Sequence, residues 1–318
     1  MNNTLLGIHH VTAIAGDPQK NLNFYGGILG LRLVKKTVNF DDPYTYHLYF
    51  GDEIGHPGTL LTFFPWSAQA HRGTRGTGQI SVFSFSIPHD SVSFWIDRLR
   101  KDGIQISKSS AKFSEEVISG QDHDGFEFEL IASPEEKRDG WENGAIPSKH
   151  AIRGFHSVTL SEAFSDSTGE FLLSSLSFRK SAEADGRTRY ESVSGGGPGV
   201  FVDVLHQPDA PGGSMGVGIV HHVAWRTPTD ATQLEIRQQL VRDSLSVTPV
   251  IDRNYFHSIY FHEPGGVLFE VATDLPGFLI DEPKESLGTS LKLPVQYESW
   301  RNKLEKALVP LSIPHPRR

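Results

Sequence analysis

Two adjacent histidine pairs, His9-His10 and His221-His222, each lie at the start of an apolar segment with the pattern of a β-strand. Glu270 follows the second pair by 48 residues, within another segment of this kind. Two imidazoles and one carboxylate can hold a divalent metal on one face and leave up to three positions open for substrate and oxygen. The 15 histidines in 318 residues predict about 0.7 adjacent pairs by chance, so the argument depends on where the pairs lie.

The composition limits the chemistry that the chain can perform. The sequence contains no cysteine, which excludes thiolate metal ligands, iron-sulfur clusters, a cysteine nucleophile and disulfides, and leaves His, Asp and Glu as metal ligands. A formal net charge of -8 and scattered Lys and Arg residues argue against a nucleic-acid partner. No apolar stretch reaches the roughly 18 residues of a membrane span, and Met1 to Gly7 lack a signal-peptide pattern. We therefore expect a soluble, cytoplasmic protein.

The strand-like segments recur in four units of roughly 70 residues. Their opening strands begin with related apolar patterns at residues 7, 80, 154 and 219, and their closing strands cover residues 59–64, 125–130, 199–204 and 266–271. Helix start signals follow three of the opening strands, at Asp17-Pro18, Ser91 and Thr229 or Asp230, whereas the middle of the third unit is unclear. Two further strands fit before each closing strand, so the unit is βαβββ and the fold class is α+β.

Comparison of corresponding positions in the four units tests where a metal could bind. The opening strands carry His10, Val82, Ser157 and His222, and the closing strands carry Thr62, Glu129, Asp203 and Glu270. One unit offers only a curved half-sheet, so two units must pair to enclose a cavity. Pairing of units one and four places both histidines and Glu270 in one cavity, whereas pairing of units three and four leaves His10 unexplained. We favour two open barrels, with the metal barrel formed by the first and fourth units.

The carboxylates and Thr62 refine this expectation. Glu270 lies among apolar neighbours, where a carboxylate costs several kcal/mol unless it is paired or binds a metal. Glu129 has no partner histidines, and we interpret it as an ion-pair or rim residue rather than a ligand. Thr62 occupies the position of a fourth protein ligand, which favours a site with open positions over a four-ligand isomerase-type site.

The sequence predicts three parts of the chain. An N-terminal half covers residues 1–140, a C-terminal half covers residues 150–280, and an extension covers residues 281–318, with two units in each half. Residues 133–153 lack apolar periodicity and are expected to link the halves. Within the extension, residues 297–308 have the pattern of an amphipathic helix that packs against the body of the protein.

Three segments are specific enough to indicate a family: residues 7–12 (GIHHVT), Phe24-Tyr25 with residues 31–41 (LRLVKKTVNFD), and residues 260–270 (YFHEPGGVLFE). They resemble the vicinal-oxygen-chelate superfamily of glyoxalases, bleomycin resistance proteins and extradiol dioxygenases, in particular its hydroquinone-type ring-cleaving dioxygenases. The resemblance extends over nearly the whole chain. It implies iron bound by the residues that the repeat also selects: His10, His222 and Glu270. It further implies an outer shell around the substrate: His9, Thr12, His221, Arg253 and Tyr260.

Strand alternation argues against both histidines of a pair entering one cavity, because neighbouring residues point to opposite faces. A bulge could still bring one imidazole to the substrate for proton transfer, and we prefer His221 to His9 in this role. Arg253 could stabilise a substrate oxyanion and Tyr260 could donate a hydrogen bond to it, although a surface cation and a core aromatic are equally good interpretations. Other histidines are expected to be structural: His47, His56, His123, His156, His257 and His262. One or two aromatic residues are expected to line the ring pocket, and the rest to lie in the core: Phe24, Tyr25, Phe63, Phe64, Trp66 and Trp225.

The sequence and the resemblance together predict a non-haem Fe(II) ring-cleaving dioxygenase that opens an aromatic diol, a hydroquinone or a catechol, with O₂. Mn(II) is the alternative metal. The expected partners are the small aromatic diol and O₂, without nucleic acid or membrane, and a homo-oligomer is compatible with the sequence. Two alternatives remain open at this point: a glyoxalase-like metal-dependent isomerase or lyase, and a metal-free resistance protein that binds an aromatic compound.

Overall fold

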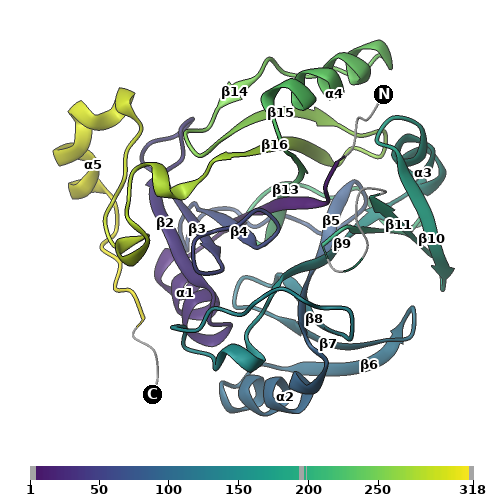
Figure 1. Cartoon of the computed structure of the whole chain (residues 1–318), viewed down its shortest axis with the longest axis horizontal. Helices are drawn as coiled ribbons and strands as arrows, with labels where there is room; N and C mark the ends of the chain where they lie inside the picture. Colours follow the sequence, from purple (N-terminus) through teal and green to yellow (C-terminus); the bar gives the residue numbers. More distant parts are fainter. Residues whose placement is uncertain (1–4, 193–196, 198, 315–318) are drawn as a thin grey trace.

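The structure is a computed structural model that describes residues 5–192, 197 and 199–314 (Figure 1). Unit one contains β1 (Ile8–Ala15), α1 (Pro18–Leu22), the π-helix η1 (Asn23–Ile28), β2 (Arg32–Val38), β3 (Tyr46–Gly51) and β4 (Leu60–Pro65). Unit four contains β13 (Ile219–Thr227), α4 (Asp230–Arg242), β14 (Ile251–Asp252), β15 (Phe256–His262) and β16 (Leu268–Pro276). Both units have the expected βαβββ order.

The two middle units repeat the same order. Unit two contains β5 (Gln79–Pro88), η2 (His89–Ser91), α2 (Val92–Lys101), β6 (Ile106–Lys112), β7 (Glu115–Gln121) and β8 (Glu127–Ser133). The short η3 (Ser148–His150) precedes unit three, which contains β9 (Gly154–Glu162), α3 (Ser165–Ser174), β10 (Phe178–Ala184), β11 (Arg187–Ser192) and β12 (Phe201–His206).

Side-chain caps explain why some helices were easier to predict than others. The Asp17 carboxylate accepts the backbone N–H groups of Gln19 and Lys20 at 2.8 and 3.0 Å, and Pro18 occupies the first turn of α1. Thr229 caps α4 by accepting the N–H of Thr232. By contrast, α3 follows Phe164, which makes no capping hydrogen bond, so its start has no sequence signal.

The strands of the described residues form two eight-stranded sheets that pair the units as expected. The first sheet has the order β14-β15-β16-β13-β1-β4-β3-β2, and the second has the order β10-β11-β12-β9-β5-β8-β7-β6. Units one and four therefore share the first sheet through an antiparallel β1–β13 pair, and units two and three share the second through β5–β9. The expected α+β fold of four βαβββ units in two open barrels is confirmed.

The register between the opening and the closing strand is the same in all four units. Each closing strand runs parallel to its opening strand, and the pairs that hold the compared positions are Thr12–Thr62, Ser84–Glu129, Thr159–Asp203 and Ala224–Glu270. In every unit, the compared residue of the closing strand therefore pairs with the residue that follows the compared residue of the opening strand by two positions. The alignment of the repeats by sequence is therefore also an alignment in space.

A β-bulge precedes the compared position on each opening strand. In the β1–β13 pair, Ile8 lies opposite Trp225 and His10 opposite Ala224, so His9 is the extra residue on β1. In the same way, His221 is the extra residue on β13, and Ser81 and His156 are the extra residues on β5 and β9. A bulged residue interrupts the strict alternation of faces, which allows both members of a histidine pair to approach one site.

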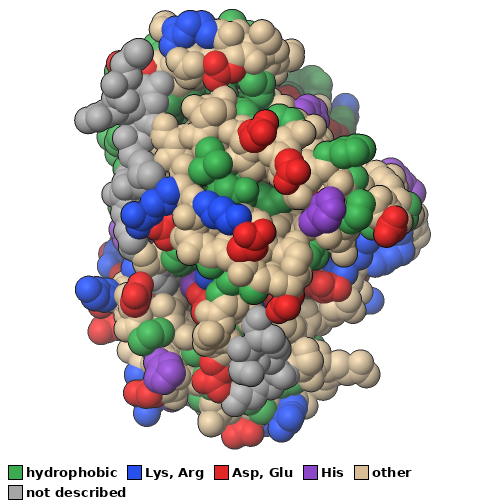
Figure 2. Space-filling model, turned by 90° about the vertical axis from the view of Figure 1, so that its right-hand side faces the viewer, with side chains coloured by type: hydrophobic (Ala, Val, Ile, Leu, Met, Phe, Trp, Pro, Cys, Tyr) green, Lys and Arg blue, Asp and Glu red, His purple; other side chains and the backbone are tan. Residues whose placement is uncertain are grey.

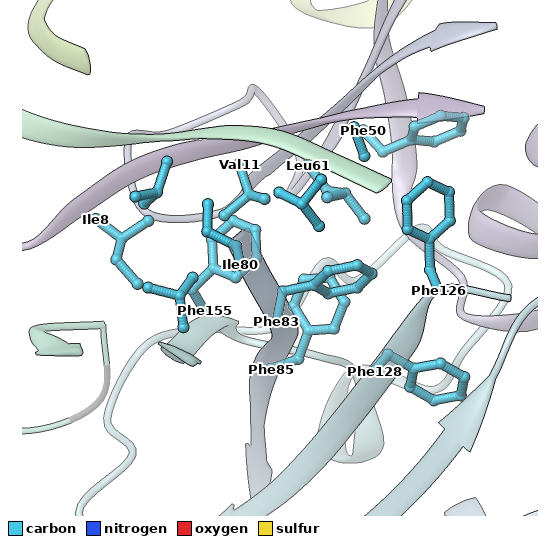
Figure 3. Packing of buried hydrophobic residues seen from close by; sticks show 14 of the residues in the cluster. Ile8, Val11, Phe50, Leu61, Ile80, Phe83, Phe85, Phe126, Phe128 and Phe155 are labelled. Carbon is cyan, nitrogen blue, oxygen red and sulfur yellow. The ribbon is translucent and has the colours of Figure 1, made fainter. Parts of the chain in front are cut away.

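The two sheets pack against each other through a continuous apolar core (Figure 3). Aliphatic and aromatic side chains meet between them: Ile8, Val11, Phe50 and Leu61 from unit one, and Ile80, Phe83, Phe85, Phe126, Phe128 and Phe155 from units two and three. Each of these side chains is nearly inaccessible to water, and burial of one large apolar side chain contributes roughly 1.5–3 kcal/mol. The core therefore holds the opening strands of both barrels in fixed positions.

The C-terminal extension packs along the outer edge of the first sheet, where Figure 1 shows it beside β2. It contains η5 (Lys284–Ser286), η6 (Val295–Trp300) and α5 (Arg301–Ala307), and η4 (Phe278–Ile280) leads into it. Lys35 of β2 is fully buried and donates to the carboxylates of Asp281 and Glu282 at its start. The predicted helix over residues 297–308 is thus divided between η6 and α5.

The described side chains on one face of the molecule form no basic field (Figure 2). Acidic and basic side chains are interspersed on the face that Figure 2 shows, with small apolar patches between them. Among the described helices, none has the length and hydrophobicity needed to cross a bilayer.

In the second barrel, Lys112 lies against the two carboxylates at the positions that correspond to the metal triangle of the first barrel. The Lys112 ammonium lies 2.6 Å from Glu129 and 3.2 Å from Asp203, the two carboxylates at the compared closing-strand positions. Arg189 also binds Asp203, with a 2.7 Å contact from Nε. Ser84 donates to Glu129 at 2.5 Å. Glu129 is therefore an ion-pair residue, in agreement with the interpretation from sequence.

We expect substitution of Lys112 by methionine to lower the free energy of unfolding by about 3 kcal/mol, because it removes the ammonium that the partly buried Glu129 and the buried Asp203 share and leaves Arg189 to Asp203 alone. Urea unfolding of K112M and of the wild type measures the difference. K180M is the matched control, since Lys180 forms an exposed pair with Glu183 and should change stability little. Equal stability of K112M and the wild type would contradict the proposed role of the ammonium group.

A pair of buried carboxyl groups joins units three and four. Glu263 accepts the Thr168 hydroxyl at 2.7 Å and the Val267 N–H at 2.8 Å. Glu162 Oε1, at the end of β9, has no hydrogen-bond partner among the described residues. Burial and the nearby Glu263 carboxylate raise the pKa of Glu162 from 4.5 to about 8.

This shift predicts a pH dependence of stability. Between pH 4.5 and about 8 the unfolded chain releases the Glu162 proton while the folded chain keeps it, so the free energy of unfolding falls as the pH rises. The E162Q variant lacks this loss, and its stability relative to the wild type should increase by about 3 kcal/mol between pH 5 and pH 8. Urea unfolding at the two pH values measures it. A difference that is independent of pH would show that Glu162 is ionised normally.

Candidate metal centre

Three potential ligand atoms converge at the junction of units one and four. His10 Nε2 lies 3.3 Å from His222 Nε2 and 3.3 Å from Glu270 Oε2, and His222 Nε2 lies 2.9 Å from the same oxygen. The three residues are almost completely buried. They come from β1, β13 and β16, which are adjacent in the first sheet. The structure therefore brings the three predicted ligands together.

Glu270 has one oxygen that is bound and one that is not. Oε1 accepts the Ser258 hydroxyl at 2.5 Å, which fixes the orientation of the carboxylate. Oε2 is buried without a well-aligned hydrogen bond from any described residue, although both histidine Nε2 atoms lie within 3.3 Å. A buried carboxylate oxygen facing two imidazole nitrogens fits a divalent cation.

The protonation of His10 follows from its neighbour His9. His9 Nε2 lies 3.2 Å from the carbonyl oxygen of Thr273, which can only accept, so this nitrogen carries the proton of the ring. Burial lowers the pKa of His9 well below 6.5, so the ring is neutral. His9 Nδ1 then accepts from His10 Nδ1 at 2.9 Å, which leaves the lone pair of His10 Nε2 directed at the candidate centre.

The second histidine pair repeats this contact but ends differently. His221 Nδ1 and His222 Nδ1 lie 2.7 Å apart, so His222 Nε2 can also present a lone pair when His222 donates to His221. Burial, with a contribution from His222, lowers the pKa of His221 to about 3, so this ring is also neutral. Its Nε2 accepts or donates no hydrogen bond within the described part of the chain. When His222 donates to His221 Nδ1, the proton of the His221 ring lies on Nε2 and is available to a ligand.

A cavity of about 250 Å³ opens directly onto the three ligand atoms. The residues that line it come mainly from units one and four: His10, Thr12, Asn39, Phe40, Asp41, His47, Tyr49, Phe64, Trp66, His221, His222, Arg253, Phe256, Tyr260 and Glu270. His221 is among them and His9 is not. Of the six aromatic residues considered from sequence, Phe64 and Trp66 line the cavity.

Arg253 and Tyr260 form one side of this cavity. Arg253 Nε donates to the Tyr260 hydroxyl at 3.1 Å, and Nη1 donates to the exposed Asp41 carboxylate at 3.2 Å. Burial raises the pKa of Tyr260, so its hydroxyl keeps the proton. Because that oxygen accepts from Arg253, its own proton is free to be donated to a ligand. Both residues line the cavity together with His10, His222 and Glu270.

Thr62 is not part of the metal triangle. Its hydroxyl lies 2.8 Å from the Thr12 hydroxyl and 2.9 Å from His47 Nε2. The position of a fourth protein ligand is thus occupied by a hydrogen-bonded threonine. His47, which was expected to be structural, instead lines the cavity, and this expectation was wrong because β3 places His47 on the same face as Thr62.

The structure adds residues that the sequence did not single out. Ser258 orients Glu270, Tyr49 binds His47 at 2.9 Å, and Asp41 binds Arg253. A period of two along β3 and β15 could have found two of these residues, since Tyr49 shares a face with His47 and Ser258 shares a face with Tyr260. Asp41 lies in a loop, where no periodicity applies.

A second cluster of possible ligands, Asp122, His123 and Asp124, has a structural explanation. Asp122 accepts the N–H groups of Asp124 and Phe126 and the Tyr25 hydroxyl, and Asp124 accepts the N–H of Gly16. Both carboxylates thus tie the β7–β8 turn to unit one. A larger cavity, of about 950 Å³, lies beside this cluster and away from the histidine triangle.

Comparison with known proteins gives consistent matches. Residues 7–130 match the family described as the Glyoxalase/Bleomycin resistance protein/Dioxygenase superfamily. A Bacillus subtilis protein named "Putative ring-cleaving dioxygenase MhqO" is 44% identical over 97% of both chains. The "Chlorohydroquinone/hydroquinone 1,2-dioxygenase" of Sphingobium indicum is 34% identical over 95% of both. The crystal structure of a "putative dioxygenase" from Bacillus subtilis superposes with a TM-score of 0.94, at 43% identity, over 98% of this chain and 99% of that one. The chain belongs to the glyoxalase, bleomycin resistance protein and dioxygenase superfamily.

Proposed function

We propose that this protein is an Fe(II)-dependent dioxygenase that cleaves the ring of a small aromatic diol. The observation that carries the proposal is the triangle of His10, His222 and Glu270 at the base of a cavity with Thr62 in place of a fourth ligand. Two imidazoles and one carboxylate suit Fe(II) and leave coordination positions for a diol and O₂. Mn(II) is the alternative metal for the same donor set.

The residues present fit such a metal. Glu270 Oε2 has no aligned hydrogen-bond donor among the described residues, and the arrangement of His9 supports a free lone pair on His10 Nε2. Bound at these three residues, Fe(II) would bring the diol and O₂ together and pass electron density from one to the other.

The size of the cavity supports a substrate with a single ring. A cavity of about 150 Å³ holds benzene, so 250 Å³ accommodates one ring with its hydroxyl groups and small substituents. Phe64, Trp66 and Phe256 offer apolar surface to the faces and edges of the ring. The name of the Sphingobium relative supports a hydroquinone, and a catechol remains the second candidate.

The polar residues of the cavity are suited to stabilising a negative charge on the substrate and to donating protons to it. Arg253 offers a cation to a deprotonated substrate hydroxyl, which lowers the cost of burying that charge. Tyr260 can donate its hydroxyl proton to a substrate oxygen, because its own oxygen already accepts from Arg253. His221 lines the cavity, and when its Nδ1 accepts from His222 its Nε2 carries a proton that it can donate to an oxygen atom during ring opening.

The proposal predicts that the variants H10A, H222A and E270Q lose bound iron and all oxygen uptake, because each removes one of three ligands. The purified proteins are loaded with Fe(II) without air, analysed for metal, and then mixed with substituted hydroquinones or catechols in an oxygen electrode. E129Q is the control, since Glu129 holds the corresponding place in the second barrel and pairs with Lys112. It should keep its iron and its activity.

Two results would overturn this proposal. Unchanged metal content in all three variants would place the metal elsewhere. Isomerisation of a glutathione hemithioacetal by the wild type, without oxygen consumption on any diol, would establish a glyoxalase-type reaction instead.

A second prediction concerns His9, which orients a ligand without facing the cavity. The H9F variant keeps a ring but loses the acceptor for His10 Nδ1, so the affinity for iron should fall by about 10- to 100-fold. Competition with a chelator measures the affinity. H123A is the control, because His123 lies in the cluster that ties the β7–β8 turn to unit one. Equal affinities in H9F and the wild type would show that His10 needs no such support.

A further inference from the structure

A chain of four hydrogen-bonded side chains, three of them buried, runs along the cavity beside the metal triangle. The Tyr49 hydroxyl lies 2.9 Å from His47 Nδ1, His47 Nε2 lies 2.9 Å from the Thr62 hydroxyl, and Thr62 lies 2.8 Å from the Thr12 hydroxyl. Tyr49, Thr62 and Thr12 are almost inaccessible to water. Tyr49, His47 and Thr12 line the cavity, whereas Thr62 lies behind them.

The chemistry of these groups decides the direction of the chain. Burial lowers the pKa of His47 well below 6.5 and raises that of Tyr49, so a neutral imidazole meets a neutral phenol. A neutral imidazole has one donor and one acceptor nitrogen. A phenol is a far stronger acid than an aliphatic alcohol and a weak acceptor, so Tyr49 donates and His47 Nδ1 accepts. His47 Nε2 then carries the proton and donates to Thr62.

The remaining steps follow from the capacity of each hydroxyl. The Thr62 oxygen accepts from His47, so its single proton is free to be donated to Thr12. The Thr12 oxygen accepts from Thr62, and its own proton has no acceptor among the hydrogen bonds of the described residues. Since Thr12 lines the cavity, that proton is directed at whatever occupies it.

We propose that Tyr49, His47 and Thr62 form a hydrogen-bond relay that fixes the Thr12 hydroxyl as a donor to an oxygen atom of the bound aromatic diol. The inference rests on the proposed function for the identity of the ligand, but the direction of the relay is a property of the protein alone. Thr12 contacts the substrate, and the other three are positioning residues that act through it. Thr62, which occupies the position of a fourth protein ligand, is thus a member of the relay.

The direction of the relay is tested by the tautomer of His47. The ¹⁵N chemical shifts of the imidazoles are recorded in the full-length protein labelled in histidine and loaded with Zn(II), a diamagnetic ion, and the His47 signals are assigned by their loss in H47Q. We expect the proton on Nε2 and an acceptor nitrogen at Nδ1. A proton on Nδ1 would reverse the relay, make Tyr49 the donor to the cavity, and overturn the proposal whatever the enzyme does.

The donation to substrate is tested by the kinetics of diol oxidation. The T12V variant should lower kcat/KM by about tenfold, the loss of one hydrogen bond to a polar oxygen, and T62V by about fivefold, because Thr12 is then no longer held as a donor. T62S keeps a hydroxyl at the same place and should restore most of the loss. T37V is the matched control, since Thr37 is equally buried opposite His47 on β2 but its hydroxyl has no partner among the described residues.

A double mutant separates a relay from a general loss of packing. If Thr62 acts only through Thr12, the T12V/T62V variant should be no slower than T12V. Losses in T12V and T62V that multiply in the double mutant, or a loss in T62S as large as in T62V, would contradict the relay. If the wild type oxidises no diol but His47 shows the Nε2–H tautomer, the proposed function fails and the direction of the relay stands.

Discussion

The antiparallel pairing of β1 with β13 is the constraint on which the candidate centre depends. It joins the first and last units of the chain and brings His10 within 3.3 Å of His222, 212 residues away. The bulges at His9 and His221 give each ligand a neighbouring imidazole bonded through Nδ1, which strict strand alternation would have turned away. The β5–β9 pair has bulges at the corresponding positions without a histidine pair. The bulges are therefore a feature of the repeated unit and do not depend on a metal site.

Both barrels must neutralise carboxylates that the repeat places in a buried position, and they do so differently. In the second barrel the Lys112 ammonium lies between Glu129 and Asp203, so this barrel carries its own cation. In the first barrel Glu270 meets Ser258 on one oxygen and the imidazoles of His10 and His222 near the other, and the described side chains supply no lysine or arginine at the ligand atoms. Buried charge requires a partner, and here the partner that fits is a metal ion.

Sequence patterns predicted what depends on periodicity and repetition. They identified the four units, the pairing of units one and four, the convergence of His10, His222 and Glu270, and the ion-pair character of Glu129, because each follows from a register that recurs. They missed His47, whose role depends on the pairing of β3 with β4. They also could not select Lys112 as the cation of the second barrel, because the end of β6 meets Asp203 of another unit only in the folded chain.

The entrance to the cavity depends on segments that have no repeat counterpart. Asp41, in the loop between β2 and β3, binds Arg253 of unit four, and the neighbouring Phe40 carbonyl accepts the Tyr297 hydroxyl at 2.8 Å. Tyr297 belongs to the C-terminal extension, which the buried ion pairs of Lys35 attach to the outer edge of the same sheet. Loss of those pairs would leave charges buried, so the extension is held firmly and the loop that it contacts is held with it. The extension therefore contributes to the shape of the cavity, although none of its described residues lines it.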